Sequence, residues 1–347
     1  MGTTAYQPLV LVETSELPRE EWLAYRRRGI GGSDAAAVLG ISPFMTGRDL
    51  YYDKLGISAA ADDENWVAKE IGHRLEPLVA EIFSKRTGLK VFQKKFMFQH
   101  PQYPWMLADL DYLVELPDGS IAILECKTST SNSSENWWYA GKEIVPAYYE
   151  SQGRHYMAVM NYGKTFFCCL FTDTREAIIR SIDRDMAYEE ELIALEDTFW
   201  NENVVKQLPP EYTENGDLVM KSVQRLLGPA ATDAPPVVIT PPQFSRVKKF
   251  MQLQEQKSSF DAEIKKLDKE MARLKALIVA DMGNSCKALY EDAEGNYTIT
   301  YNPVYKQSIP KEGLDRLKAV HPEIYSEYVK TSESRRFLVK KVSDSAA

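Results

Sequence analysis

The stretch Leu107–Lys127, LADLDYLVELPDGSIAILECK, decides how the first part of this chain folds. Its centre, Pro117-Asp118-Gly119, is a turn signal, because proline presets φ and glycine accepts a positive φ. Apolar residues flank this turn on both sides. The stretch therefore predicts a two-stranded hairpin, with Asp109 and Asp111 in its first strand and acidic residues at both strand ends.

The second strand of this hairpin, Ile121 to Lys127, alternates strictly between two faces. Successive side chains of a strand point to opposite faces, so Glu125 and Lys127 project together from one of them. An acid and an amine on an otherwise apolar strand are costly unless they pair or hold something. With Asp111 beside them, they form an oxygen-rich site suited to Mg²⁺ or Mn²⁺. The same spacing also arises by chance, so the assignment of a metal site depends on the motifs in the rest of the chain.

Composition indicates a soluble globular protein of one large domain or two. The chain has 347 residues, of which 44% are hydrophobic and 27% charged. A net charge of −8 argues against a generic polyanion binder, yet a nuclease needs only a local basic lining. No apolar run approaches membrane-spanning length, and the N-terminus lacks the features of a secretion signal. Four cysteines without metal spacing fit reduced thiols, so we expect a cytoplasmic protein.

Upstream of the hairpin, a basic triplet, Arg26 to Arg28, ends a short predicted helix. Glycines follow, and Ser33 and Asp34 are typical of an N-cap pair that opens a second helix. A glycine turn before a helix presents free backbone N–H groups, and the neighbouring arginines favour a phosphate as the bound anion. A capped helix with solvated arginines explains the same residues equally well.

Two further helices border the hairpin in sequence. The segment from Asn65 to Thr87 has one apolar face, and Glu76 lies beside that face. Glu76 is interpreted either as a solvated charge at the edge of the helix or, if a metal site lies next to it, as a metal ligand. Pro77 is expected to kink or restart this helix. Pro146 to Met160 is also predicted to be helical and carries Gln152, a residue type that normally lies at the surface.

Strands are predicted at Val91 to His100 and Thr165 to Thr172, and an acidic helix at Met186 to Asn203. The resulting order of helices and strands predicts an α/β core, a short mixed sheet flanked by helices. This order resembles the PD-(D/E)XK nuclease core, which is restriction-endonuclease-like.

Within that class, an N-terminal motif and the four motifs that follow it resemble one family in sequence and in order. WLAYRRRGIGGSDAAAVLG, which begins at Trp22, is similar to the N-terminal motif of the YqaJ-type viral recombinase family, which includes phage lambda exonuclease. GHRLEP, LADLDYL, LECK and ESQGRHYM follow in that family's order, and together they cover residues 20 to 200. The cysteine cluster of the Cas4-like branch of the superfamily is missing.

The resemblance implies a site for two Mg²⁺ or Mn²⁺ ions. The implied ligands are Glu76, Asp111, Glu125 and the backbone carbonyl of Cys126. Lys127 and Gln152 would orient the attacking water. A lysine beside carboxylates tends to stay protonated, so positioning suits Lys127 better than proton abstraction.

The resemblance also implies a grip on the 5′-phosphate of the degraded strand. Arg26 and Ser33 match the family's positions for this role, and Arg28 is a further candidate. The family often has Ser-Pro-Asp-Gly where this chain has Asp109-Leu110-Asp111-Tyr112. Two roles stay open for Asp109, an additional metal ligand or a replacement that weakens the dependence on a 5′-phosphate.

The chain is predicted to divide into a nuclease domain at 1–215, a linker at 216–242 and a C-terminal part at 243–347. The apolar residues from Phe250 to Ile278 follow a 3-4 spacing interrupted by Lys257, which predicts a coiled-coil-like helix of about four heptads. A hairpin at 290–305, a helix at 314–328 and a basic strand at 335–341 follow. This tail is interpreted as a module that guides DNA or docks a partner, or as a structural or oligomerisation arm.

Together these features favour a metal-dependent 5′→3′ exonuclease that degrades linear double-stranded DNA for phage-type recombination. The family further implies a ring-shaped homo-oligomer, often a trimer, and a single-strand annealing protein as partner. It also implies a protein encoded by a phage or prophage in a bacterial host. A structure-specific or flap endonuclease on the same core is one alternative. A non-catalytic DNA-binding recombination scaffold is another, and the intact set of site residues argues against it.

Overall fold

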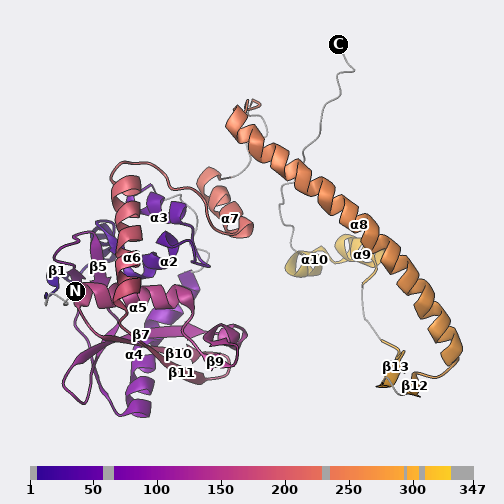
Figure 1. Ribbon diagram of the computed structural model, residues 1–347, viewed down its shortest axis with the longest axis horizontal. Helices are drawn as coiled ribbons and strands as arrows, with labels where there is room; N and C mark the ends of the chain where they lie inside the picture. The colour runs from indigo at the N-terminus through magenta and orange to yellow at the C-terminus, as the bar shows by residue number, and fades with distance from the viewer. Residues whose placement is uncertain (1–5, 58–65, 229–234, 293–294, 305–308, 330–347) are drawn as a thin grey trace. The chain divides into compact units, whose positions relative to one another are not determined.

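A computed structural model of the chain describes residues 6–57, 66–228, 235–292, 295–304 and 309–329. The chain forms two compact units, Met1–Thr232 and Asp233–Ala347 (Figure 1). The strands of the first unit are β1 (Leu9–Glu13), β2 (Ile30–Gly31), β3 (Lys90–Phe92), β4 (Phe96–Gln99), β5 (Met106–Asp109), β6 (Tyr112–Glu115), β7 (Ile121–Ser129), β8 (Trp138–Tyr139), β9 (Lys142–Glu143), β10 (Lys164–Phe171) and β11 (Glu176–Asp183). Its α-helices are α1 (Arg19–Arg26), α2 (Gly32–Val38), α3 (Gly47–Lys54), α4 (Trp66–Thr87), α5 (Ala147–Met160), α6 (Met186–Thr198) and α7 (Gly216–Leu227).

A five-stranded mixed sheet of order β11-β10-β7-β6-β3 lies at the centre of the first unit. Strand β7 pairs parallel with β10 and antiparallel with β6, and the remaining pairs are antiparallel. A parallel pair needs a crossover connection, and α5 supplies it between β7 and β10. The mixed sheet flanked by helices confirms the predicted fold class.

The two faces of β7 enter two different apolar cores. Ala122 and Leu124 pack in one cluster with Val79 and Phe83 of α4. Ile123, on the opposite face, belongs to the cluster that contains Met157 of α5. The predicted alternation of this strand is therefore confirmed, and its polar end faces α5.

The first strand of the predicted hairpin is in fact two strands in different sheets. β5 belongs to a four-stranded sheet of order β1-β4-β5-β2, whereas β6 belongs to the five-stranded sheet. The chain leaves one sheet and enters the other at Leu110 and Asp111. At this crossing the Asp111 carboxylate, rather than a backbone carbonyl, accepts the Cys126 N–H at 2.8 Å. The predicted strand at Val91 to His100 is likewise divided into β3 and β4.

Two predicted helix boundaries differ from the structure. Helix α2 begins at Gly32 with Gly31 as its N-cap, so Ser33 and Asp34 lie in its first turn. Asp34 accepts the Gly31 N–H at 3.0 Å but otherwise serves ion pairs with distant residues. Helix α4 does not restart at Pro77, which lies inside it. The buried contacts of this helix with the sheet outweigh the one backbone bond that a proline removes.

The first unit extends beyond the predicted boundary at residue 215. Helix α7 occupies the start of the predicted linker, and its Leu218 is buried. Ser222 and Arg225 of this helix both bond the carboxylate of Asp49 on α3, each at 2.8 Å. These contacts tie α7 to the core of the first unit.

The second unit is built on α8 (Pro241–Met282), a single helix of 42 residues. It begins earlier than predicted because Thr240 and Gln243 form a capping box and prolines occupy its first turn. Its remaining described elements are β12 (Lys287–Asp292), β13 (Gly295–Thr300), α9 (Lys311–Val320) and α10 (Pro322–Tyr328). The predicted long helix and hairpin are present, whereas the single helix predicted at 314–328 is divided into α9 and α10, with Pro322 at the start of α10. The predicted basic strand at 335–341 lies outside the described residues.

All four cysteines are free thiols, and only Cys286 is exposed. Across the described ranges, no helix combines the length and the apolar character that crossing a membrane requires.

Candidate functional site

The structure brings three of the predicted site residues into one hydrogen-bonded group. Lys127 Nζ lies 3.0 Å from Glu125 Oε1 and 2.9 Å from Gln152 Oε1. Gln152 Nε2 donates to the same oxygen of Glu125 at 2.5 Å. Glu125 is only 3% exposed, and Gln152 is buried rather than at the surface. The sheet-facing side of α5 thus holds the polar end of β7.

This group leaves one carboxylate oxygen unused. Glu125 Oε2 is buried and has no hydrogen-bond partner within the described part of the chain. Burial, followed by the charge of Glu125, raises the pKa of the Asp111 carboxyl to about 8. Burial opposes the charge on Lys127, but Glu125 and Asp111 outweigh it and raise the pKa of the amine. The site therefore places acidic groups close together around one amine whose pKa they raise.

Glu76 approaches this group from α4. Its Oε1 lies 3.5 Å from His73 Nδ1, and its side chain is 29% exposed. Burial, then the charge of Asp111, raises the pKa of the Glu76 carboxyl to about 7. Within the described ranges, however, no three His, Cys, Asp or Glu side chains are grouped closely enough to hold a metal by themselves.

The donors that are present fit a hard divalent cation. Asp111 and Glu125 offer carboxylate oxygens, and one of these oxygens is buried without a partner. Mg²⁺ is commonly held by one or two carboxylates, with water and substrate phosphates completing its shell. Cys126 contributes at most its backbone, because its thiol packs in the apolar cluster against α4. Burial raises the pKa of this thiol, which keeps it neutral.

A cavity of about 850 Å³ connects the carboxylates with the basic residues of the N-terminal motif. Glu76, Asp111, Glu125 and Gln152 line it together with Arg26 and Ser33. Further cations also line it: Arg19, Lys69, Lys94 and Lys95. An anionic polymer could therefore contact cations and the carboxylate group within one cavity.

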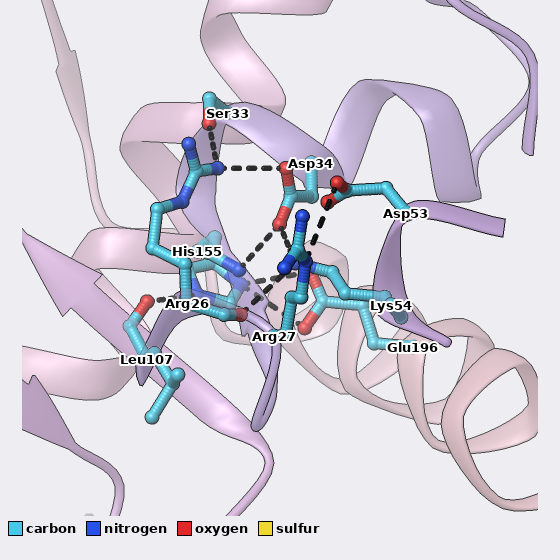
Figure 2. Close-up of polar contacts among 10 residues, drawn as sticks. Arg26, Arg27, Ser33, Asp34, Asp53, Lys54, Leu107, His155 and Glu196 are labelled. Carbon is cyan, nitrogen blue, oxygen red and sulfur yellow. Dashed lines mark hydrogen bonds and ion pairs between the residues drawn. The ribbon is translucent and has the colours of Figure 1, made fainter. Parts of the chain in front are cut away.

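Arg26 and Ser33, predicted to hold a phosphate, contact each other directly. Arg26 Nη2 donates to Ser33 Oγ and to Asp34 Oδ1, both at 2.9 Å (Figure 2). Arg28 differs, because its guanidinium lies over the Tyr25 ring at 4.4 Å from the centroid. It is not among the described residues that line the cavity.

Asp109 makes a contact that its sequence context did not suggest. Its Oδ2 accepts the indole N–H of Trp22 at 2.6 Å. The guanidinium of Arg26 in turn lies over the Trp22 ring, 5.0 Å from the centroid. Burial raises the pKa of Asp109, while the Trp22 bond and the Arg26 charge oppose this.

Two buried ion pairs escaped sequence reasoning, and both appear in Figure 2. Lys54 Nζ lies 2.6 Å from Asp34 Oδ2, and His155 Nδ1 lies 2.8 Å from Glu196 Oε1. His155 Nε2 also bonds the Leu107 carbonyl at 2.9 Å, joining α5 to β5. Lys54 shares a helical face with buried Leu50 and Tyr51. This placement is the sequence feature that could have indicated a buried lysine in need of an acidic partner.

A mixed sheet with an acid at a strand crossing, Glu-x-Lys on the next strand and flanking helices defines a PD-(D/E)XK-type core. The family model for the YqaJ-like viral recombinase domain matches residues 21–163. The "Uncharacterized protein YqaJ" of Bacillus subtilis (strain 168) is 30% identical over 346 residues, spanning 98% of this chain and 100% of that protein. The chain belongs to the YqaJ-like viral recombinase family, which confirms the resemblance drawn from the motifs.

Solved structures show a looser likeness. An alkaline exonuclease, LHK-Exo, from Laribacter hongkongensis is 19% identical with a TM-score of 0.44, over 60% of this chain and 99% of that one. A phage related exonuclease from Haemophilus somnus 129PT is 13% identical with a TM-score of 0.39, over 52% and 96%.

Proposed function

We propose that this protein is a metal-dependent 5′→3′ exonuclease that degrades linear double-stranded DNA during phage-type recombination. The observation that carries the proposal is the state of the Glu125 carboxylate. One oxygen is fixed by Lys127 and Gln152, and the other is buried beside Asp111 without a partner among the residues that the structure describes. Such an arrangement is costly in a protein unless a cation completes it.

Asp111 and Glu125 would hold Mg²⁺ or Mn²⁺, two ions in the full form of the proposal, with Glu76 acting directly or through water. When bound, such ions stabilise the attacking and the leaving oxygen of an in-line phosphodiester displacement. Glu125 and Asp111 raise the pKa of the Lys127 amine, which favours a role in orienting the water over one in abstracting its proton. Two of its N–H groups fix Glu125 and Gln152, and an ammonium has a third donor with which to orient the nucleophile.

The polarity of degradation would come from the other end of the cavity. Arg26 and Ser33 would bind the terminal 5′-phosphate, since a guanidinium and a hydroxyl together offer several donors to its oxygens. The lysines that line the cavity would contact backbone phosphates further along the strand. Double-stranded DNA ends, a single-strand annealing protein and copies of this chain in a ring are the partners that family membership supports.

The test is digestion of one linear duplex, labelled at either 5′ or 3′ ends, beside its closed circular form. With Mg²⁺ we expect the linear duplex to be lost from its 5′ ends, the circle to persist, and EDTA to stop the reaction. A nicked or linearised circle would instead support the structure-specific endonuclease. Binding without any cleavage under these conditions would support the scaffold.

A further inference from the structure

The side chain of Arg26 is held on two sides by protein groups. Along its edge, Nη2 donates to Asp34 Oδ1 and to Ser33 Oγ. Against its face lies the ring of Trp22. The Arg26 side chain is still 28% exposed and lines the cavity, so this hold leaves part of the guanidinium accessible.

Lys54 holds Arg26 from inside the protein. Its side chain is 0% exposed, so it cannot itself contact DNA. Its ammonium donates to Asp34 Oδ2 at 2.6 Å and to the backbone carbonyl of Arg26 at 3.1 Å. Lys54 therefore fixes the main chain of Arg26 directly and its guanidinium through Asp34 (Figure 2).

The charges of these three residues decide whether the site can still attract an anion. An Arg26–Asp34 pair alone would be neutral, and a neutral pair has little attraction for a phosphate. With Lys54 the group carries one net positive charge. Burial raises the pKa of the Asp34 carboxyl, but Lys54 and Arg26 outweigh it and hold the pKa well below its usual range, which keeps the carboxylate ionised.

The opposite side of Arg26 is fixed by a second pair. Trp22 cannot rotate away freely, because its indole N–H is bonded to Asp109 Oδ2 at 2.6 Å. The acid that replaces the family's serine thus orients Trp22, and Trp22 orients Arg26. Holding an arginine in place before binding removes much of the side-chain entropy that binding would otherwise cost.

We propose that Lys54, Asp34, Trp22 and Asp109 are positioning residues that preorganise Arg26 and so set a preference for 5′-phosphorylated over 5′-hydroxyl DNA ends. This inference rests on the proposed exonuclease function. The measured quantity is the ratio of kcat/KM on a 5′-phosphorylated linear duplex to kcat/KM on the same duplex with 5′-hydroxyl ends.

The first variant is Lys54→Met, with Arg26→Ala as reference. Loss of a charge-assisted contact should lower the ratio by about tenfold, mostly through KM on phosphorylated ends, while 5′-hydroxyl ends are degraded as in the wild type. General damage to the fold would instead lower both rates together. Because Lys54 is buried, it can act on a DNA end only through the residues that it contacts, among them Arg26 and Asp34.

Trp22→Ala is the second variant, and it carries the test if Lys54→Met does not fold. Trp138→Ala is its matched control, since Arg180 lies over that ring at 5.1 Å from its centroid, away from the cavity lining. We expect Trp22→Ala to lower the ratio and Trp138→Ala to leave it unchanged. The inference would be overturned if folded Lys54→Met and Trp22→Ala kept the wild-type ratio while Arg26→Ala lost it. That result would leave the exonuclease function intact. A wild-type protein that degrades neither duplex would remove the proposed function itself.

Discussion

At the scale of single residues, the site depends on what a buried charge can tolerate. Glu125 and Lys127 stand two residues apart on β7, and burial alone would disfavour the ionised form of each. The 3.0 Å contact with Lys127 and the amide of Gln152 supply hydrogen bonds to only one of the two Glu125 carboxylate oxygens among the described residues. This arrangement supports the proposed metal site, in which Lys127 is the donor that fixes Glu125 and Gln152.

Lys127→Ala tests this role. We expect the variant to cleave DNA at least about 100-fold more slowly than the wild type, because the positioned donor is gone. DNA binding should change little. Rates on a linear duplex and binding by fluorescence anisotropy in Ca²⁺ would measure the two effects. Lys142→Ala, at an exposed lysine of β9, is the matched control. Cleavage by Lys127→Ala at a comparable rate would place the reaction centre elsewhere.

At the scale of elements, the position of Gln152 depends on how closely α5 lies on the sheet. Gly153 permits this approach, since a Cβ there would lie 2.7 Å from Phe167 Cζ and 3.1 Å from Thr165 Cγ2 of β10. Phe167 and Thr165 are both fully buried, so they have little freedom to move aside. The glycine beside Gln152 thus sets the distance between helix and strand.

Gly153→Ala should therefore destabilise the first unit by about 1–3 kcal/mol, the typical cost of overpacking. It should also slow cleavage, because α5 carries Gln152 away from Glu125 as it shifts. Urea unfolding and the cleavage assay provide the two measurements. Gly163→Ala is the control, since a Cβ at Gly163 would meet no atom within 4 Å. Equal stability of the two variants would show that α5 has more room than this packing implies.

At the scale of the whole molecule, the two units can be followed separately. The six tryptophans all lie at or before Trp200, so their fluorescence reports on the unfolding of the first unit. His100 is buried in this unit, and its Nδ1 accepts the backbone N–H groups of Gln102 and Tyr103, each at 3.1 Å. Burial, helped by the charges of His155 and Arg184, lowers its pKa to about 4.

A histidine whose pKa is lower in the folded state than in the unfolded chain stabilises the fold above its unfolded pKa. As pH falls from about 6.5 to about 4, the unfolded chain binds the proton first and this stabilisation is lost, at up to about 1.4 kcal/mol per pH unit. His100→Asn keeps an acceptor but does not titrate, so it should lose less stability between pH 7 and pH 4.5. Urea unfolding at both values, followed by tryptophan fluorescence, makes the comparison. An equal loss in wild type and variant would exclude His100 as a source of acid sensitivity.

The sequence by itself determined the elements that depend on local pattern. The alternation of β7 placed Glu125 and Lys127 on one face, and periodicity predicted α4, α5 and the long α8. Motif order identified the family and proposed Glu76, Asp111 and Gln152 as companions. These features follow from neighbours in the chain, so a linear pattern carries them.

Tertiary structure decided what depends on residues far apart in sequence. The hairpin's first strand is divided between two sheets, and at the crossing the Asp111 side chain accepts the Cys126 N–H. Lys54 meets Asp34, His155 meets Glu196 and Trp22 meets Asp109 only once packing has excluded water from between them. A buried charge must find a partner wherever the fold places one, and no local pattern specifies that partner in advance.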